Sequence, residues 1–209
     1  ILVFRNLAPP AVEDSLKALA AAIRQSQIMV IPGGFSSGDE PDGSGKFIAT
    51  VLRNPIVRDA VVELLTERDG LILGICNGFQ VLTEAGLLPG ALQKNSGLKF
   101  LCQPTVLRVE TSASILTGRV PVGTELSVPI NHFEGNYTCD DETLARLRDE
   151  DRIVLRYVDN PNGSVDDIAG VCNEGRNVVG LMPHPERACD ELLGSADGAV
   201  LIGSLLDAA

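Results

Sequence analysis

The sequence has no tryptophan, few other aromatic residues and a deficit of positive charge. Aromatic residues make up 4% of its 209 residues and hydrophobic residues 44%, so small aliphatic side chains must build the core. Such a composition is typical of parallel sheets that are covered by helices on both faces. The formal net charge of −11 argues against nucleic acid or an anionic membrane as a partner, because phosphate binding requires clustered lysine and arginine.

The sequence also lacks long apolar runs and paired cysteines. No run approaches the ~18 apolar residues that a transmembrane helix requires, and no signal peptide is recognisable, so we expect no membrane partner. The five cysteines are irregularly spaced and form no C-x-x-C pair, so we expect neither a metal site nor a disulfide framework. A reducing, cytoplasmic location is the corresponding expectation. The cysteines are Cys76, Cys102, Cys139, Cys172 and Cys189.

One cysteine lies in a distinctive pattern. Residues 71–73 predict a buried strand, residues 79–85 predict a helix, and Gly74-Ile75-Cys76-Asn77-Gly78 stands between them. This pattern is the nucleophile elbow with cysteine in place of serine, where glycines avoid collisions on either side of a sharp turn. A helix N-terminus also favours the thiolate. The alternative is a small buried cysteine in an ordinary strand–helix unit, but the flanking glycines favour the elbow.

The order of the predicted elements defines the fold class. Strand, helix and strand in succession imply a right-handed crossover, so we predict an α/β fold with an open, mostly parallel sheet and helices on both faces. Alternating segments between residues 100 and 137 predict a small antiparallel extension. We expect one domain over residues 1–209. The expected strands are 1–5, 28–31, 71–73, 105–110, 125–130, 153–157, 168–172 and 178–181; the expected helices are 11–25, 46–53, 55–68, 79–85, 140–149 and 195–206; and 131–137 is an expected loop.

A glycine-rich loop follows the second predicted strand. Pro32-Gly33-Gly34 opens it and residues 35–45 continue it, at the carboxyl end of a strand, where α/β proteins bind their ligands. Adjacent glycines allow backbone N–H groups to approach a substrate oxygen closely. A flexible surface loop is the alternative. A phosphate-binding loop is disfavoured because the Gly-Lys-Ser/Thr ending is missing.

The chain has two histidines, and one of them is well placed to assist Cys76. His184 stands in Pro183-His184-Pro185-Glu186, where the prolines disfavour a helix and predict an extended segment. Residues i and i+2 of an extended segment project to the same side, so Glu186 could orient His184 and complete a Cys-His-Glu triad. His132 also has a glutamate at i+2, so geometry alone does not separate the two histidines. We expect His132 to line the pocket or to cap its own loop.

Together these residues resemble a known family. Pro32-Gly33-Gly34, Gly74 to Gln80 and His184-Pro185-Glu186 match, in order, the three motifs of class I (triad-type) glutamine amidotransferases, which have a flavodoxin-like fold. Within that class the sequence most resembles the glutaminase part of phosphoribosylformylglycinamidine (FGAM) synthase, and residues 32–39 and 182–187 support this resemblance. It covers nearly the whole chain.

The resemblance implies a cysteine-dependent glutaminase. Cys76 would attack the side-chain amide of glutamine to form a thioester and release ammonia. His184 would protonate the leaving ammonia and later activate water, and Glu186 would orient His184.

The resemblance also implies which groups bind the substrate. The backbone N–H groups of Gly34 and Asn77 would form the oxyanion hole, and Gln80 would help to hold glutamine. The expected oxyanion and substrate-binding residues are Gly33, Gly34, Asn77, Gln80 and His132.

A partner is implied as well. The ammonia would pass to a synthetase domain or subunit, where ATP and Mg²⁺ activate formylglycinamide ribonucleotide in de novo purine biosynthesis. Nothing in this chain resembles a site for that ATP, so we expect no cofactor here.

The sequence departs from the family in two places, and two other hypotheses stay open. The family usually begins with a further strand and helix ahead of Ile1, so we expect this chain to be a fragment of a longer polypeptide. Phe133 stands where the family has glycine in a His-Gly-Glu-Gly pattern. The first alternative is the glutaminase of another biosynthetic amidotransferase. The second is a non-enzymatic protein that senses oxidation through Cys76 and has no need of a His184–Glu186 pair.

Overall fold

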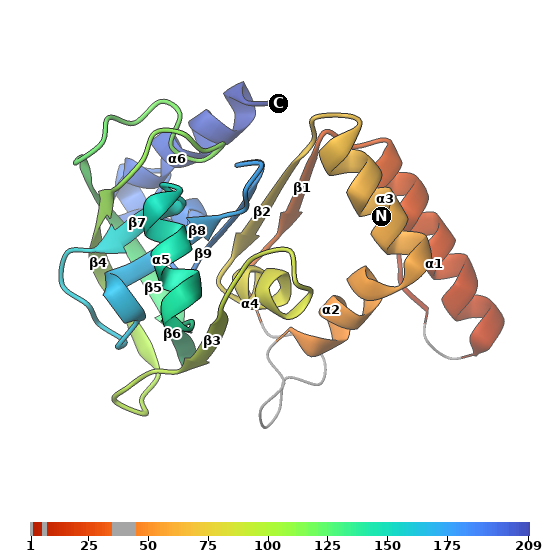
Figure 1. Cartoon of the computed structure of the whole chain (residues 1–209), viewed down its shortest axis with the longest axis horizontal. Helices are drawn as coiled ribbons and strands as arrows, with labels where there is room; N and C mark the ends of the chain where they lie inside the picture. Colours follow the sequence, from red (N-terminus) through yellow and green to blue (C-terminus); the bar gives the residue numbers. More distant parts are fainter. Residues whose placement is uncertain (1, 6–7, 35–44) are drawn as a thin grey trace.

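The computed structural model describes residues 2–5, 8–34 and 45–209 (Figure 1). Most of the glycine-rich loop, residues 35–44, lies outside the described residues. Figure 1 shows α1, α2 and α3 grouped beyond β1 at one end of the molecule, with α5 towards the other end.

The α-helices are α1 (Pro9–Arg24), α2 (Lys46–Arg53), α3 (Pro55–Thr66), α4 (Asn77–Glu84), α5 (Asp141–Asp149) and α6 (Asp197–Asp207), and the 3-10 turns are η1 (Val165–Asp167), η2 (Pro185–Arg187) and η3 (Glu191–Leu193). The strands are β1 (Ile28–Ile31), β2 (Leu71–Ile75), β3 (Ala91–Lys94), β4 (Leu101–Val109), β5 (Glu125–His132), β6 (Glu134–Thr138), β7 (Ile153–Tyr157), β8 (Ile168–Cys172) and β9 (Val178–Leu181).

The main sheet has the strand order β1-β2-β9-β8-β7-β4-β5, and it is mixed rather than mostly parallel. The pairs β1–β2 and β2–β9 are parallel. The pairs β9–β8, β8–β7, β7–β4 and β4–β5 are antiparallel. A short connection over residues 173–177 joins β8 to β9 as a hairpin, and a tight turn of this kind joins antiparallel strands, so the sheet changes direction there. The α/β class is confirmed, but the expectation of a mostly parallel sheet is wrong.

The strands that we expected in an antiparallel extension are β4 and β5, which extend the main sheet through antiparallel pairs. β4 pairs with β5 on one side and with β7 on the other. A small second sheet consists of β3, for which the sequence predicted no strand, and β6, most of which we expected to be a loop. β5 ends at His132 and β6 begins at Glu134. The expectation of a loop over residues 131–137 is therefore wrong, because these residues belong to the two strands, with only a bend at Phe133 between them. Gly135 and Asn136 form strands poorly, which hid β6 from the sequence pattern.

The first predicted strand is not formed by the described residues 2–5. These residues take no part in the sheet, where β1 pairs with β2. Phe4 packs edge-on against Phe47 of α2, with 6.2 Å between the ring centroids. This contact places the segment against a helix, so the predicted crossover from residues 1–5 to β1 is wrong.

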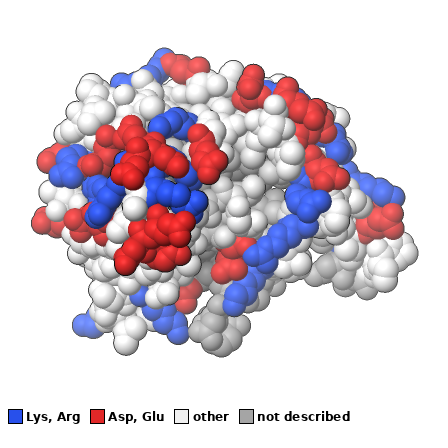
Figure 2. Space-filling model, in the orientation of Figure 1, with Lys and Arg blue, Asp and Glu red and all other residues white. Residues whose placement is uncertain are grey.

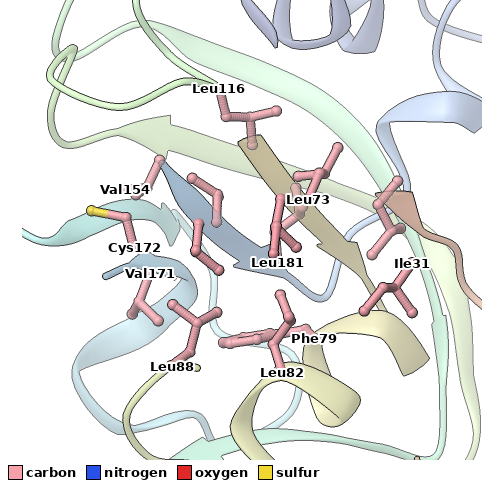
Figure 3. Close-up of a cluster of buried hydrophobic side chains, with 14 of the residues drawn as sticks. Ile31, Leu73, Phe79, Leu82, Leu88, Leu116, Val154, Val171, Cys172 and Leu181 are labelled. Carbon is pink, nitrogen blue, oxygen red and sulfur yellow. The ribbon is translucent and has the colours of Figure 1, made fainter. Parts of the chain in front are cut away.

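The helix α4 is fixed to the sheet by a dense apolar core (Figure 3). Phe79 of α4 is fully buried next to the strands that carry Leu73 and Leu181. Gly180 on β9 makes room for the Phe79 ring, which a Cβ at that position would overlap. Phe79 also stacks on Tyr137 of β6, with 5.8 Å between the ring centroids. The position of α4 is therefore set by tight packing on two sides.

Acidic and basic side chains gather in mixed clusters on the face shown in Figure 2. One network crosses several elements, because Arg156 of β7 lies 3.1 Å from Glu110 and 2.6 Å from Asp166 of η1. Within the described residues, no helix is long and apolar enough to cross a membrane.

Candidate active site

Cys76 stands at the junction of β2 and α4, as the sequence predicted, and its backbone is strained. Its φ of +51° and ψ of −106° form a combination that residues with a side chain rarely adopt. Its amide donates a hydrogen bond of 2.8 Å to the carbonyl of Leu181 on β9, and its carbonyl accepts one of 2.9 Å from the amide of Phe79. Neighbouring elements thus hold the strained residue on both sides, as a nucleophile elbow requires.

The two glycines of the elbow are needed for space, as the sequence predicted. A Cβ at Gly74 would lie 2.6 Å from the Leu82 side chain and 2.7 Å from the backbone of Gly78. A Cβ at Gly78 would overlap the carbonyl of Ile31 at the end of β1. Gly78 therefore also allows β1, and the Gly33 loop that follows it, to approach the elbow.

The thiol of Cys76 is buried and protonated at neutral pH. The residue is 6% exposed, and its Sγ donates to the carbonyl of Asn131 at 3.6 Å. Burial raises the pKa of the Cys76 thiol to about 11, although a hydrogen bond from the backbone of Asn77 and the charge of Arg187 act against this rise. The expectation that the helix N-terminus would favour the thiolate is therefore wrong in this state, because burial has the larger effect.

His184 and Glu186 are paired, with 2.6 Å between His184 Nδ1 and Glu186 Oε1. The sequence predicted this pairing for the wrong reason. Residues 185–187 form the 3-10 turn η2 and not an extended segment, because Pro185 is well suited to the first position of a helical turn. His184 is 1% exposed, and its amide donates to the carbonyl of Pro129 on β5, so the histidine is anchored to the sheet.

The pairing defines which nitrogen of His184 can act as a base. Because a carboxylate only accepts, Nδ1 carries the proton that is donated to Glu186, and the neutral ring has a bare Nε2. Nε2 is buried and has no hydrogen-bond partner among the described residues. The ring lies beside the nucleophile, because a Cβ built on Gly33 would lie 2.6 Å from His184 Cε1 and 3.3 Å from Cys76 Cβ. The structure thus brings Gly33, Cys76 and His184 together.

His132 is held by a buried asparagine that the sequence did not suggest. Asn95 Oδ1 accepts from the amide of Gly135 at 3.1 Å, so it also accepts from His132 Nδ1, which lies 3.1 Å away. His132 Nε2 is therefore a bare acceptor, and it has no partner among the described residues. Burial and then the neighbouring charge of His184 lower the pKa of His132 to about 4, so this ring is neutral at physiological pH.

Gln80 connects the elbow to the second sheet. Asn77 Nδ2 donates to Gln80 Oε1 at 2.9 Å, and Gln80 Nε2 donates to the carbonyl of Glu134 on β6 at 2.7 Å. Gln80 therefore holds the side chain of the residue that follows the nucleophile. Gly34 has a φ of +145°, a backbone conformation that favours glycine. A Cβ on Gly34 would have no neighbouring heavy atom of the described residues within 4 Å.

Sequence reasoning missed three contributors to this site: Asn95, the carbonyl of Asn131 and Arg187. Asn95 lies in a stretch of polar and glycine residues that predicts a loop, and Arg187 is a single charge in a turn. Neither carries a pattern that distinguishes it from a surface residue. Within the described residues, no group of three or more histidine, cysteine or acidic side chains could hold a metal ion.

The fold and the site define a class of protein, in which a cysteine elbow on an α/β sheet lies beside a buried histidine that is paired with a carboxylate. The chain belongs to the family of CobB/CobQ-like glutamine amidotransferase domains, whose family model matches residues 7–197. It is similar to phosphoribosylformylglycinamidine synthase subunit PurQ of Koribacter versatilis, with 49% identity over 191 residues that span 86% of this chain and 79% of the relative. The PurQ subunit of Cereibacter sphaeroides is 53% identical over 179 residues, which span 86% of this chain and 78% of that relative.

A solved structure supports the same relationship. A chain in the structure of PurLQS from Thermotoga maritima is 42% identical to this chain, with a TM-score of 0.73, and the match covers 87% of this chain and 79% of that chain. The resemblance found in the sequence, to the glutaminase part of FGAM synthase, is confirmed.

Proposed function

We propose that this chain hydrolyses glutamine to glutamate and ammonia with Cys76, His184 and Glu186, and supplies the ammonia for the synthesis of FGAM in purine biosynthesis. The observation that carries this proposal is Nε2 of His184, which is buried beside Cys76 and has no hydrogen-bond partner in the described part of the chain, while Glu186 holds the opposite nitrogen at 2.6 Å. A buried acceptor without a donor is costly, and a proton from the nucleophile or the substrate would satisfy it.

The first half of the reaction forms a thioester. The Cys76 sulfur attacks the side-chain carbonyl carbon of glutamine while its proton moves to His184 Nε2, and the carbonyl oxygen becomes an oxyanion. The N–H groups of Asn77 and Gly34 stabilise that charge. The C–N bond then breaks, and the proton on His184 passes to the leaving nitrogen, which departs as ammonia.

The second half returns the enzyme to its starting state. Water attacks the thioester carbon and gives a proton to His184 Nε2, and the C–S bond breaks to release glutamate. The proton on His184 then returns to the sulfur. Because burial raises the pKa of the Cys76 thiol to about 11, proton transfer to His184 accompanies the attack, and no thiolate forms beforehand.

The substrate pocket follows from the neighbouring groups. Gly33 lies against both Cys76 and His184, and a side chain there would collide with the His184 ring. His132 is neutral, and none of the described residues donates to its Nε2, so it can accept a hydrogen bond from an N–H donor of the substrate. Gln80 already bonds to Asn77 and Glu134, so it supports the pocket wall and contributes to glutamine binding with its remaining capacity.

The ammonia has to reach an acceptor that this chain does not carry. We propose that it passes to a synthetase that holds ATP and Mg²⁺ and converts formylglycinamide ribonucleotide, and that both work in the cytoplasm. The PurLQS structure of Thermotoga maritima supports PurL-like and PurS-like partners. Glutamine-dependent formation of FGAM in the complete enzyme tests the acceptor, and the absence of product with active glutaminase would favour another biosynthetic amidotransferase.

The nucleophile and the pocket can be tested together by labelling with a diazo-ketone analogue of glutamine. We expect mass spectrometry to find the adduct on Cys76 alone, and excess glutamine to prevent it. Labelling of several cysteines that glutamine does not affect would contradict the proposal.

Glu186→Gln separates the enzyme from a redox sensor. The neutral amide cannot stabilise a positively charged His184, so we expect glutamine turnover to fall at least a hundredfold. Unchanged turnover would overturn the triad assignment.

A further inference from the structure

Arg187 stands next to the triad carboxylate on the same 3-10 turn. Its Nε lies 3.7 Å from Glu186 Oε1, the same oxygen that accepts from His184 Nδ1 at 2.6 Å. The side chains of Glu186 and Arg187 are 43% and 48% exposed, whereas that of His184 is 1% exposed. The carboxylate therefore has a buried partner on one side and a solvent-facing partner on the other.

An exposed carboxylate needs more than one contact to stay in place. The third member of a triad fixes the orientation of the histidine, and an exposed Glu186 side chain can rotate into water and lose that contact. A guanidinium beside Oε1 opposes this rotation, because it favours the arrangement in which the oxygen serves both neighbours.

The charges of the two residues also act on Cys76 in opposite directions. Arg187 lowers the pKa of the Cys76 thiol and Glu186 raises it. Within the part of the chain that the structure describes, other titratable groups near the sulfur include His184, His132 at the end of β5 and Tyr157 of β7. Tyr157 is fully buried, and burial raises its pKa far above the physiological range, while His132 is neutral, so neither offsets Glu186.

We propose that Arg187 is a positioning residue for glutamine hydrolysis, which holds the Glu186 carboxylate on His184. This proposal rests on the proposed function, whereas the alkylation of Cys76 described below requires no turnover.

The kinetic test compares Arg187→Gln with Arg187→Lys in the full chain together with its synthetase partner. We expect kcat to fall about tenfold in R187Q, with KM for glutamine within twofold of wild type. R187K keeps the charge but loses the planar guanidinium, so it should recover part of the lost rate.

The matched control is Arg58→Gln on α3, because Arg58 also lies 3.7 Å from a neighbouring carboxylate, that of Asp59, and is exposed. We expect R58Q to behave as wild type.

The second readout is independent of turnover. The rate at which iodoacetamide alkylates Cys76 is followed by mass spectrometry from pH 7 to 10. We expect R187Q to react about threefold more slowly at each pH, equivalent to a rise of about half a pKa unit, with R187K and R58Q close to wild type.

The outcomes separate the proposals. Unchanged kcat and an unchanged alkylation profile in R187Q would overturn the positioning role. A raised KM with unchanged kcat would also overturn it, since Arg187 would then contact the substrate. A shifted alkylation profile in a protein that does not hydrolyse glutamine would support the charge effect and contradict the proposed function.

Discussion

The backbone of Gly33 lies against the ring of His184, so closely that a Cβ at position 33 would be 2.6 Å from His184 Cε1. The same Cβ would be 3.3 Å from Cys76 Cβ. The loop after β1, the elbow after β2 and the turn after β9 therefore meet at one point. Gly33 is required there because a side chain would collide with the His184 ring.

We therefore predict that Gly33→Ala reduces glutaminase activity more than it reduces stability. The added methyl would displace the His184 ring, and a displacement of about 1 Å in a catalytic group can cost about a hundredfold in rate. Steady-state kinetics and thermal unfolding would measure both effects. Gly97→Ala is the control, since a Cβ at Gly97 has no heavy atom within 4 Å. A fully active G33A variant would contradict this arrangement.

The backbone strain at Cys76 predicts that an inactive variant with glycine at position 76 is more stable than one with alanine. A residue with a side chain at a φ of +51° and a ψ of −106° costs about 1–3 kcal/mol, and glycine avoids most of this cost. Cys76→Gly and Cys76→Ala should both abolish turnover, and C76G should be about 1 kcal/mol more stable than C76A after the larger chain entropy of unfolded glycine is included. Chemical denaturation would compare them. Equal or lower stability of C76G would show that the elbow is not strained.

The reactivity of Cys76 should depend steeply on pH. Because burial raises the pKa of its thiol to about 11, the thiolate fraction grows about tenfold per pH unit below that value. Alkylation of Cys76 by iodoacetamide in the absence of glutamine should therefore keep rising between pH 7 and 10. A plateau near pH 8 would mean that the thiolate already exists in the unliganded protein.

His132 should make the protein less stable in mild acid. The pKa of His132 falls to about 4 in the folded protein from an ordinary value near 6.5, so the unfolded chain binds its proton first as the pH falls. This contribution to stability is complete above pH ~6.5 and is lost as the pH falls towards ~4, with a total on the order of 3 kcal/mol. Denaturation of the wild type and His132→Gln over this range would measure it. Equal pH dependence of the two proteins would contradict a buried neutral His132.

The parts of the site that the sequence predicted are those with local causes. The elbow around Cys76 follows from two glycines at a strand–helix junction, and the structure shows the collisions that they avoid. The pairing of His184 with Glu186 was also predictable, because two residues so close in the chain can meet in either an extended segment or a 3-10 turn. The backbone conformation around Pro185 was not predictable, since proline is compatible with an extended segment and with the first position of a 3-10 turn.

The parts that the sequence did not predict depend on residues far apart in the chain. The contact of Asn95 with His132 spans 37 positions, and that of Cys76 with the carbonyl of Asn131 spans 55. Whether neighbouring strands run parallel or antiparallel depends on which strands pair beyond the β8–β9 hairpin. The sequence does not reveal this, because the side chains of β4 and β7 alternate in the same way beside a parallel or an antiparallel neighbour.

The sequence by itself determined which groups are available for the proposed chemistry, because Cys76, His184 and Glu186 stand in short motifs whose glycines and prolines restrict the backbone. Only the tertiary structure decided the protonation and the hydrogen-bond partners of the groups in the site. Burial determines that the Cys76 thiol is protonated and that His132 is neutral, and Nε2 of His184 is buried without a partner among the residues that the structure describes. The physical reason is that the free energy of a charge depends on every group that removes water from it, and those groups come from β5, β6, β9 and η2 together.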